Sequence, residues 1–360
     1  MWCNGDIHSA DTEVEVNTGT TYDSNVFRSF TDQKKDVYFT LATRIALKMP
    51  FNKLYLSSGL HTALEQHISH TEENLQELVF YGFGRYNFSD HVSFGLQDEF
   101  IISGRLGSAE KLTDVTRYRE FVNNKLASSF KYEFMAGILT ASFGYINTIR
   151  NYKGSDKDDW IDHAGEFQIE YFFGHKTSVQ MSLEPAKKLY KMDANYISIP
   201  VIVSLKRNLT SKVDASLSLG SENRRYNSAT QGYSLDKPTV VLDITGNFTQ
   251  KTSSKLLLQR KVYDSDILTG YAFVSTNCDT LLTLNPRDDI QLILQGLYSR
   301  NGYIQIERTD NVFEGFGTIK YRLSRLGSIS FRYGYLKRTS NIADGIYKRQ
   351  LINLFYTVLF

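Results

Sequence analysis

The sequence is poor in the residues that mark several common classes of protein. It has two cysteines, Cys3 and Cys278, which are too few for a disulfide framework or a cysteine-based metal site. Its 41 basic residues nearly balance 39 acidic ones, so it has no global positive field that would attract nucleic acid. No uninterrupted run of about 18 apolar residues occurs, and the mean hydropathy is −0.32. A membrane-spanning helix is therefore excluded, whereas a membrane-spanning strand is not.

Motifs that carry chemistry are also missing. The seven histidines show no metal-ligand spacing, and the chain has no Gly-x-Ser-x-Gly elbow, phosphate-binding loop or HExxH helix. We therefore expect no catalytic residue, no metal and no cofactor.

The first ten residues lack the basic and apolar regions of a secretory signal, yet they end in the small residues Ser9 and Ala10. Residues 1–12 are either the remnant of a signal-peptide region or the irregular start of a cytosolic protein. We expect residues 13–360 to form a single domain.

Alternation of apolar and polar residues is the dominant pattern in the rest of the chain. In the stretch from Val37 to Lys48, Phe39, Leu41 and Ile45 share one face of a strand, and Arg44 lies on the other. Such runs are far longer than the roughly 5–6 residues usual in soluble sheets. We count 18 runs, and 360 residues divided by 18 leaves 20 for each strand with its connection.

The predicted connections alternate between short and long. Short ones fall near residues 49–52, 88–91, 133–137, 174–176, 208–212, 250–254, 285–289 and 324–327. Longer polar ones fall near 66–75, 103–118, 151–160, 222–238, 299–311 and 339–347. Short turns on one side and long loops on the other are typical of transmembrane β-barrels. Pro238 is expected to end a loop, while Pro185 and Pro200 lie inside proposed strands, where each removes a hydrogen-bond donor from the ladder.

The second face of the predicted strands carries many charges. Only a closed sheet leaves no unpaired backbone group in hydrocarbon, and eighteen strands enclose a space too wide for side chains to fill. The predicted fold is therefore an all-β, antiparallel, up-and-down transmembrane β-barrel of about 18 strands, with a wet lumen and no plug domain. The alternative, a soluble propeller or solenoid, lacks a repeat motif. The predicted pore-lining residues are Arg44, Lys125, Lys131, Glu133, Glu166, Gln168, Glu170, Asp243, Lys320 and Arg332.

The chain ends in RQLINLFYTVLF, which places Tyr356, Val358 and the terminal Phe360 on one strand face. This ending resembles the C-terminal recognition signal of bacterial outer-membrane barrels. The resemblance implies a location in the bacterial outer membrane, in contact with its lipid and lipopolysaccharide. It also implies that the barrel assembly machinery reads the last strand, which then closes against the first.

A second resemblance lies near the start, in Tyr22, Asp23, Asn25 and Phe27. These residues resemble the stretch that ends the first strand in the β-barrel porin type 2 family, which includes EpsL-like outer-membrane proteins of exopolysaccharide gene clusters. The family often has a proline after the following aspartate, whereas here Asp36 leads into Val37. As structure alone, the motif predicts a turn in which Asp23 and Asn25 cap local backbone groups.

The second resemblance implies a conduit that secretes an exopolysaccharide or capsular polysaccharide. Its partners would be the polymer in transit and a periplasmic polysaccharide export protein, with Tyr38 and Tyr55 available to stack on sugars. Two alternatives stay open: a general diffusion porin for small hydrophilic solutes, and a surface scaffold or adhesin that transports nothing.

Overall fold

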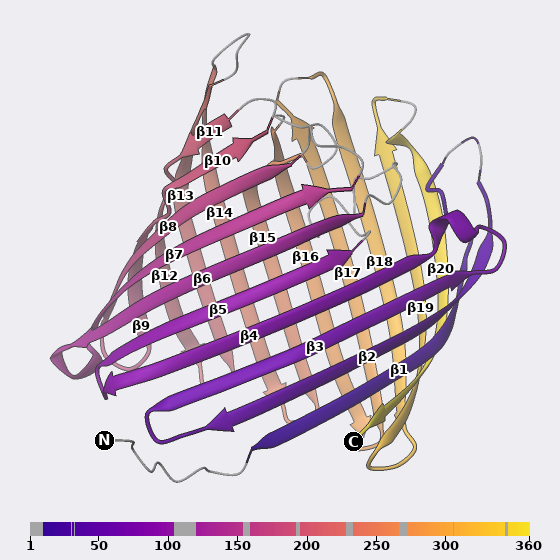
Figure 1. The fold of residues 1–360 in the computed structure, drawn as a ribbon, viewed down its shortest axis with the longest axis horizontal. Helices are drawn as coiled ribbons and strands as arrows, with labels where there is room; N and C mark the ends of the chain where they lie inside the picture. The colour runs from indigo at the N-terminus through magenta and orange to yellow at the C-terminus, as the bar shows by residue number, and fades with distance from the viewer. Residues whose placement is uncertain are drawn as a thin grey trace.

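The computed structural model describes residues 10–29, 31, 33–103, 120–153, 159–191, 195–227, 233–265, 272–304, 306–342 and 345–360. Nearly all of them belong to one antiparallel sheet of twenty strand segments (Figure 1). Besides strands, the described residues form two short 3-10 helices, Thr71–Glu73 and Met135–Gly137. None of them forms a helix long and apolar enough to cross a membrane.

The strands follow one another along the chain and around the sheet. The first ten are β1 (Asp11–Asp23), β2 (Asp36–Pro50), β3 (Leu54–His67), β4 (Leu75–Ser89), β5 (Val92–Ser103), β6 (Phe121–Phe134), β7 (Leu139–Tyr152), β8 (Trp160–Phe172), β9 (Thr177–Leu183) and β10 (Ala186–Tyr190). The other ten are β11 (Asn195–Ser198), β12 (Val201–Thr210), β13 (Val213–Asn227), β14 (Tyr233–Thr249), β15 (Thr252–Asp264), β16 (Ala272–Arg287), β17 (Ile290–Tyr303), β18 (Thr309–Arg322), β19 (Gly327–Ser340) and β20 (Tyr347–Leu359).

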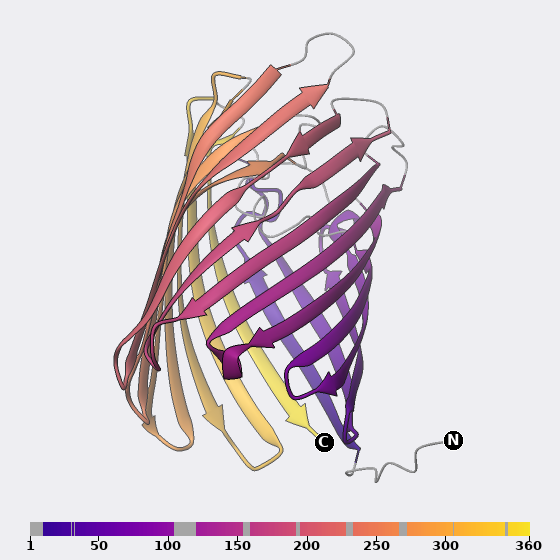
Figure 2. The same ribbon diagram turned by 90° about the vertical axis from the view of Figure 1, so that its left-hand side faces the viewer.

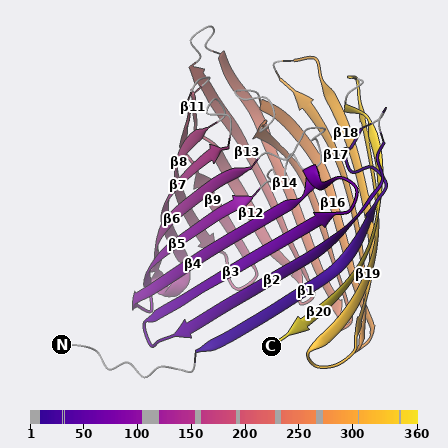
Figure 3. The ribbon, with the colours of Figure 1, turned by 45° about the vertical axis from the view of Figure 1, so that its right-hand side comes forward.

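The sheet closes on itself because β20 pairs with β1 in an antiparallel register (Figure 3). Val16 lies opposite Val358, and Thr18 lies opposite Tyr356. Beyond the strand, the Phe360 amide donates to the Val14 carbonyl at 2.9 Å. A closed sheet has no free edge, which is the condition for a strand protein to span hydrocarbon. The predicted closure of the last strand against the first is confirmed.

Two prolines divide what are otherwise continuous barrel strands. Pro185 separates β9 from β10, and Pro200 separates β11 from β12. The register on both sides of each break is unchanged, and the Glu184 amide still donates to the Pro200 carbonyl at 3.1 Å. Counted as β9 with β10 and β11 with β12, the twenty segments make eighteen barrel strands, so the predicted number is confirmed.

One predicted loop is much shorter than expected. The connection placed at 222–238 is largely strand, because β13 continues to Asn227 and β14 begins at Tyr233. Pro238 consequently lies inside β14, opposite Ser221 of β13. It is tolerated because β14 pairs with β15 only from Val240 onward, so this part of β14 has one ladder partner instead of two.

The ends of the predicted domain are only partly visible. β1 begins at Asp11, two residues before the predicted boundary at residue 13. Residues 1–9 and most of the predicted connection at 103–118 lie outside the described residues.

The two ends of the barrel differ in their connections. At one end, called the turn end, pairs such as β4–β5 and β14–β15 are joined by two residues, and the chain enters β1 and leaves β20 there (Figure 2). At the other end, called the loop end, β1 and β2 are separated by residues 24–35 and β3 and β4 by residues 68–74. Outer-membrane barrels place short turns in the periplasm and long loops outside the cell.

The two faces of the wall differ in polarity as the alternation predicts. In β8, the side chains of Phe167 and Ile169 are each 53% exposed, and they alternate with Glu166 and Gln168. The other strands present an exposed apolar set in the same way, as with Ile329, Phe331 and Tyr333 of β19. We call this apolar face outward and the polar face inward, because only the outside of a membrane barrel contacts lipid.

Candidate functional site: the inner wall of the barrel

All ten residues predicted to line a pore lie on the inward face. Nine of them directly adjoin exposed, outward apolar residues, as Lys131 does between Phe130 and Tyr132. The tenth, Asp243, follows Leu242, whose cross-strand partner Leu217 is 40% exposed. None of the ten is buried. They extend over β2, β6, β8, β14, β18 and β19, so they coat the wall and do not converge on one point.

Several of these charges form ion pairs along the wall. Lys131 pairs with Glu133 at 2.7 Å, Lys206 with Glu170 at 3.1 Å, and Lys255 with Asp243 at 3.2 Å. The Lys206 and Lys255 side chains are 44% and 47% exposed, so these pairs face the open lumen. Arg44, Lys125 and Lys320 form no ion pair with a described residue. The open part of the lumen therefore presents both signs of charge.

Several inward aromatic rings pack against neighbouring residues of the wall. Three of them cover glycines directly opposite on a neighbouring strand: Tyr81 over Gly59, Phe316 over Gly334, and Phe355 over Gly19. A side chain at any of these glycines would collide with the ring that covers it. Tyr38 packs on the ring of His67, with 4.6 Å between ring centroids. These rings fill the wall and do not stand free as platforms for sugar stacking.

At the loop end, a set of side chains that lie inside the barrel is buried instead of exposed. We call this set the loop-end belt; it comprises Asp23, Asp36, His67, Lys188, Arg224, Asp264, Ser275, Ser299, Asn301, Asp310 and Arg338. All of them are buried except Asp264, whose side chain is 16% exposed. Such burial on the inside of a barrel requires other atoms to fill the lumen at this level.

One part of that filling is the end of β15. Beyond Arg260, β15 no longer pairs with β14, and its last residue, Asp264, pairs only with Ala272 of β16. The Asp264 carboxylate accepts hydrogen bonds from Lys188 Nζ at 2.7 Å, from the Tyr196 hydroxyl at 2.7 Å, and from Arg224. These donors belong to β10, β11 and β13, on the other side of β14. The end of β15 must therefore pass on the inner side of β14, where it narrows the lumen.

Apolar packing supports this inward course of β15. Val262 packs in one buried cluster with Leu235 of β14, Tyr226 of β13 and Tyr190 of β10. Arg224 also donates to the backbone carbonyl of Val262 at 3.3 Å.

Cations and aromatic rings alternate along the wall beside Asp264. Lys188 Nζ lies 4.1 Å from the centroid of the Trp160 ring, and Arg150 Cζ lies 5.0 Å from the same ring. Arg150 is also 4.7 Å from the ring of Phe121, and Arg224 Cζ is 5.0 Å from the ring of Tyr196. Desolvated cation–π contacts of this kind are worth about 2 kcal/mol. They hold the Lys188 and Arg224 side chains in place for Asp264.

A second buried group lies on β16 to β19. Arg338 and Asp310 are paired at 2.7 Å with both side chains fully buried, and Arg308 adds a second contact to Asp310 at 3.0 Å. On the neighbouring strands, the Ser275 hydroxyl donates to Asn301, which also accepts from Ser299 at 2.9 Å.

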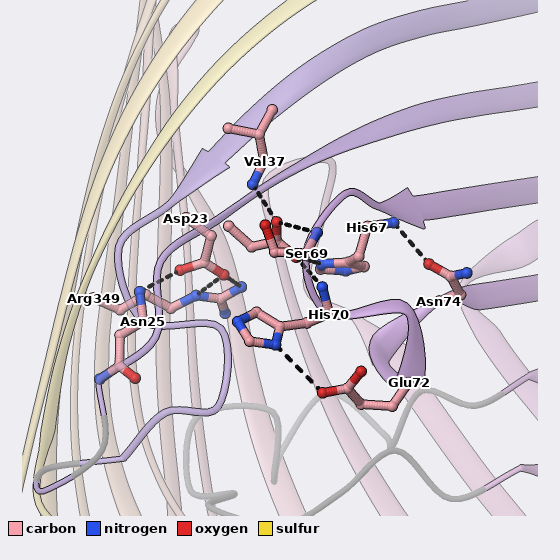
Figure 4. A network of polar contacts seen from close by, with 10 residues as sticks. Asp23, Asn25, Val37, His67, Ser69, His70, Glu72, Asn74 and Arg349 are labelled. Carbon is pink, nitrogen blue, oxygen red and sulfur yellow. Dashed lines mark hydrogen bonds and ion pairs between the residues drawn. The ribbon is translucent and has the colours of Figure 1, made fainter.

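The motif near the start of the chain completes the belt at the closing seam (Figure 4). Asp23 accepts from the Asn25 amide at 2.9 Å and from Arg349 Nε of β20 at 2.8 Å. The Asn25 side chain donates to the Lys348 carbonyl at 2.9 Å, and the ring of Phe27 packs on His70. These motif residues tie the end of β1 to β20 and to the connection after β3. Tyr22, in contrast, lies opposite Ile352 on the outward face.

Asp36 performs the same role for the next connection. Its carboxylate accepts from the amides of Val37, Ser69 and His70, and it lies 2.9 Å from Nδ1 of the buried His67. Asp36 thus anchors the connection between β3 and β4 to β2.

The sequence predicted the open lumen but missed the loop-end belt. Lys188, Arg224 and Asp264 are far apart in sequence, and Arg224 fell in a stretch expected to be loop. A signal was present, since charged and aromatic residues at inward positions gather near the loop ends of β8, β10, β11 and β13. No cluster of three or more His, Cys, Asp or Glu suited to a metal ion occurs in the part of the chain that the structure describes.

Comparisons with known proteins agree with this architecture. Residues 208–359 match the family model described as "Putative beta-barrel porin 2". No curated protein matches the chain.

Several solved porins share the fold. OccK2 (OpdF) of Pseudomonas aeruginosa, crystallised with glucuronate, superposes with a TM-score of 0.57 at 10% identity, over 99% of this chain and 100% of that one. A BenF-like porin from Pseudomonas fluorescens Pf-5 gives 0.55 at 10% identity, with coverage of 98% and 100%. OccK9 (OpdG) of Pseudomonas aeruginosa gives 0.55 at 13% identity, with coverage of 97% and 99%. The protein is a porin-like, 18-stranded antiparallel β-barrel of the bacterial outer membrane.

Proposed function

We propose that the barrel is a diffusion channel for small hydrophilic solutes. The observation that carries this proposal is the inner wall, where charges of both signs face an open lumen in the turn-end part and the end of β15 narrows it at the loop end. Barrels of 16–18 strands enclose a water-filled passage. Conduction requires weak, repeated contacts, because a single tight site would hold the solute.

Support for polysaccharide export comes from the resemblance of the Tyr22–Phe27 motif alone. The contacts of Asp23, Asn25 and Phe27 account for the motif as a closure of the barrel seam. The inward rings of Tyr38 and Tyr81 pack on wall neighbours, which leaves little aromatic surface for a sugar polymer. A small-solute channel therefore fits the inner wall better than a polymer conduit.

Assembly by the barrel assembly machinery stays a prediction from the C-terminal residues. Tyr356 and Val358 belong to the outward face of β20, opposite Thr18 and Val16. If the assembly machinery recognises β20 before it pairs with β1, this face of β20 must be accessible at that stage. Deletion of Phe360 should then slow insertion in a reconstituted assembly assay.

Reconstitution into planar bilayers and liposomes tests the proposal. We expect steady single-channel conductance and swelling rates that fall as sugars grow from mono- to tetrasaccharide. In the native cell, gene deletion should reduce small-solute uptake and leave surface polymer unchanged. A barrel that conducts nothing, or a deletion that abolishes surface polymer without affecting uptake, would contradict a diffusion channel.

A further inference from the structure

The outward face of the barrel is unevenly charged. On β1 to β8, the outward positions of the strands include a single ionisable Lys, Arg, Asp or Glu, namely Asp98, whose carboxylate accepts from Asn124 at 3.0 Å. On β10 to β20, six basic residues point outward in the loop-end half and all are exposed: Lys187, Arg225, Arg260, Arg300, Lys337 and Lys348. One outward acid accompanies them, Asp236, which already accepts from Ser221 at 2.5 Å.

These six cations lie where a membrane would end. Arg300 is ten residues from Ile290 at the turn end of β17, and Lys337 is ten residues from Gly327 at the turn end of β19. Ten residues at about 3.3 Å each, tilted by about 40°, rise about 25 Å along the barrel axis. The apolar band of outer-membrane barrels is also about 25 Å tall. Arg300 and Lys337 therefore sit at the level of the head groups in the outer leaflet. The other four cations lie within two residues of that level along their strands, from eight residues for Arg260 to twelve for Arg225.

The cations lie close enough together that a bound anion would relieve their mutual repulsion. Lys337 and Lys348 are directly opposite each other on β19 and β20, an arrangement that is destabilising for like charges. Arg260 and Arg300 both flank Thr276 from neighbouring strands, so their backbones are about 10 Å apart. None of the six forms an ion pair with a described residue. Phosphate groups at this level of the membrane would neutralise both the Lys337–Lys348 pair and the Arg260–Arg300 pair.

We propose that the outward loop-end face of β10 to β20 binds the phosphates of lipopolysaccharide. The chemistry is a set of Lys and Arg side chains that donate to phosphate monoesters just above an apolar wall, where the acyl chains of the same lipid lie. The outward face of β1 to β8, which carries no Lys or Arg at its strand positions, makes no such contact. The barrel therefore holds a shell of phosphorylated lipid on one side.

Binding of purified lipopolysaccharide to the full-length barrel in detergent tests this proposal. Two double variants remove cations, Lys337→Gln with Lys348→Gln and Arg260→Gln with Arg300→Gln. Arg207→Gln is the matched control, because Arg207 is also exposed and outward but lies at the turn end of β12. Because these side chains are exposed, folding should persist, and the heat-dependent shift of the barrel on gels verifies it.

We expect about fivefold weaker binding for each cation removed, with a loss of affinity at high salt and no change in the Arg207 variant. Lipopolysaccharide stripped of its lipid A phosphates, and micelles of phosphatidylglycerol, should bind the wild-type barrel much more weakly. The proposal is wrong if the double variants bind like wild type, if removal of the phosphates has no effect, or if phosphatidylglycerol binds equally well. Channel conductance is measured separately, so loss of lipid binding and loss of transport are distinguishable.

Discussion

Two Lys–Asp pairs on the inner wall have the same chemistry and very different surroundings. Lys255 and Asp243 lie 3.2 Å apart in the open lumen, with side chains 47% and 31% exposed. Lys188 and Asp264 lie 2.7 Å apart in the loop-end belt, with side chains 7% and 16% exposed. An exposed pair is screened by water and contributes little, whereas a buried pair cannot lose one partner without leaving an uncompensated charge. The location of a pair, not its chemistry, decides whether the barrel depends on it.

Removal of one acid from each pair should give the largest contrast. Asp264→Ala removes the buried carboxylate that pairs with Lys188 and Arg224, so that Arg224 keeps only Glu222 of its two acidic partners. We expect a loss of about 3–5 kcal/mol in the free energy of unfolding, because the remaining buried charges are less well compensated. Asp243→Ala should cost less than about 1 kcal/mol. Denaturant unfolding followed by fluorescence measures both, because Trp160 packs on Lys188 and reports on the belt. Equal losses in the two variants would show that the belt is no more structural than the open lumen.

A second contrast separates the outward from the inward face. Phe167→Arg places a charge on the lipid side of β8 near its middle, which should cost about 2–4 kcal/mol, and Val201→Arg should behave similarly. Gln168→Arg, one residue along the same strand, faces the lumen and should assemble normally. The yield of folded barrel in membranes decides the matter, and equal tolerance at the two positions would overturn the assignment of faces.

The open lumen should also select weakly between ions. Lys125, Lys131 and Lys320 face the same space as Glu133, Glu166 and Glu170, so neither sign dominates. Reversal potentials under a salt gradient should lie close to those of free diffusion. Lys320→Glu should shift the potential modestly toward cations, since wet charges act over about one Debye length, roughly 10 Å at 0.1 M salt. A strong initial preference for one ion sign would argue that the belt, not the open lumen, controls passage.

The smallest expected effect concerns Glu73, which is 9% exposed in the connection between β3 and β4. Burial raises the pKa of the Glu73 carboxyl above its usual range. A carboxyl whose pKa is higher in the folded protein than in the unfolded one loses its proton less readily when folded. It therefore lowers the stability of the folded state as the pH rises above the unfolded-state pKa. Glu73→Gln should therefore raise the unfolding temperature slightly at pH 8 and leave it unchanged at pH 4. The same small gain at both pH values would contradict the role of the charge.

The alternation of side chains was sufficient to predict the barrel. Eighteen runs were counted, and the two prolines that interrupt strands, Pro185 and Pro200, do so without changing the register. The inward position of all ten predicted lining residues follows from the same period of two. Pro238 was misplaced because proline propensity argues against a strand, whereas the separation of β14 from β15 removes the need for its missing donor.

The sequence by itself determined the properties that repeat every two residues: the strand count, the two faces, and the balance of charges along the wall. A period of two depends only on local backbone geometry, so the sequence of each strand by itself indicates which of its faces contacts lipid. Tertiary structure alone decided the loop-end belt. Lys188, Arg224 and Asp264 come together because β15 leaves its neighbour β14 and passes inside it. No local pattern encodes that departure, since it arises from contacts between residues up to 76 positions apart in the chain.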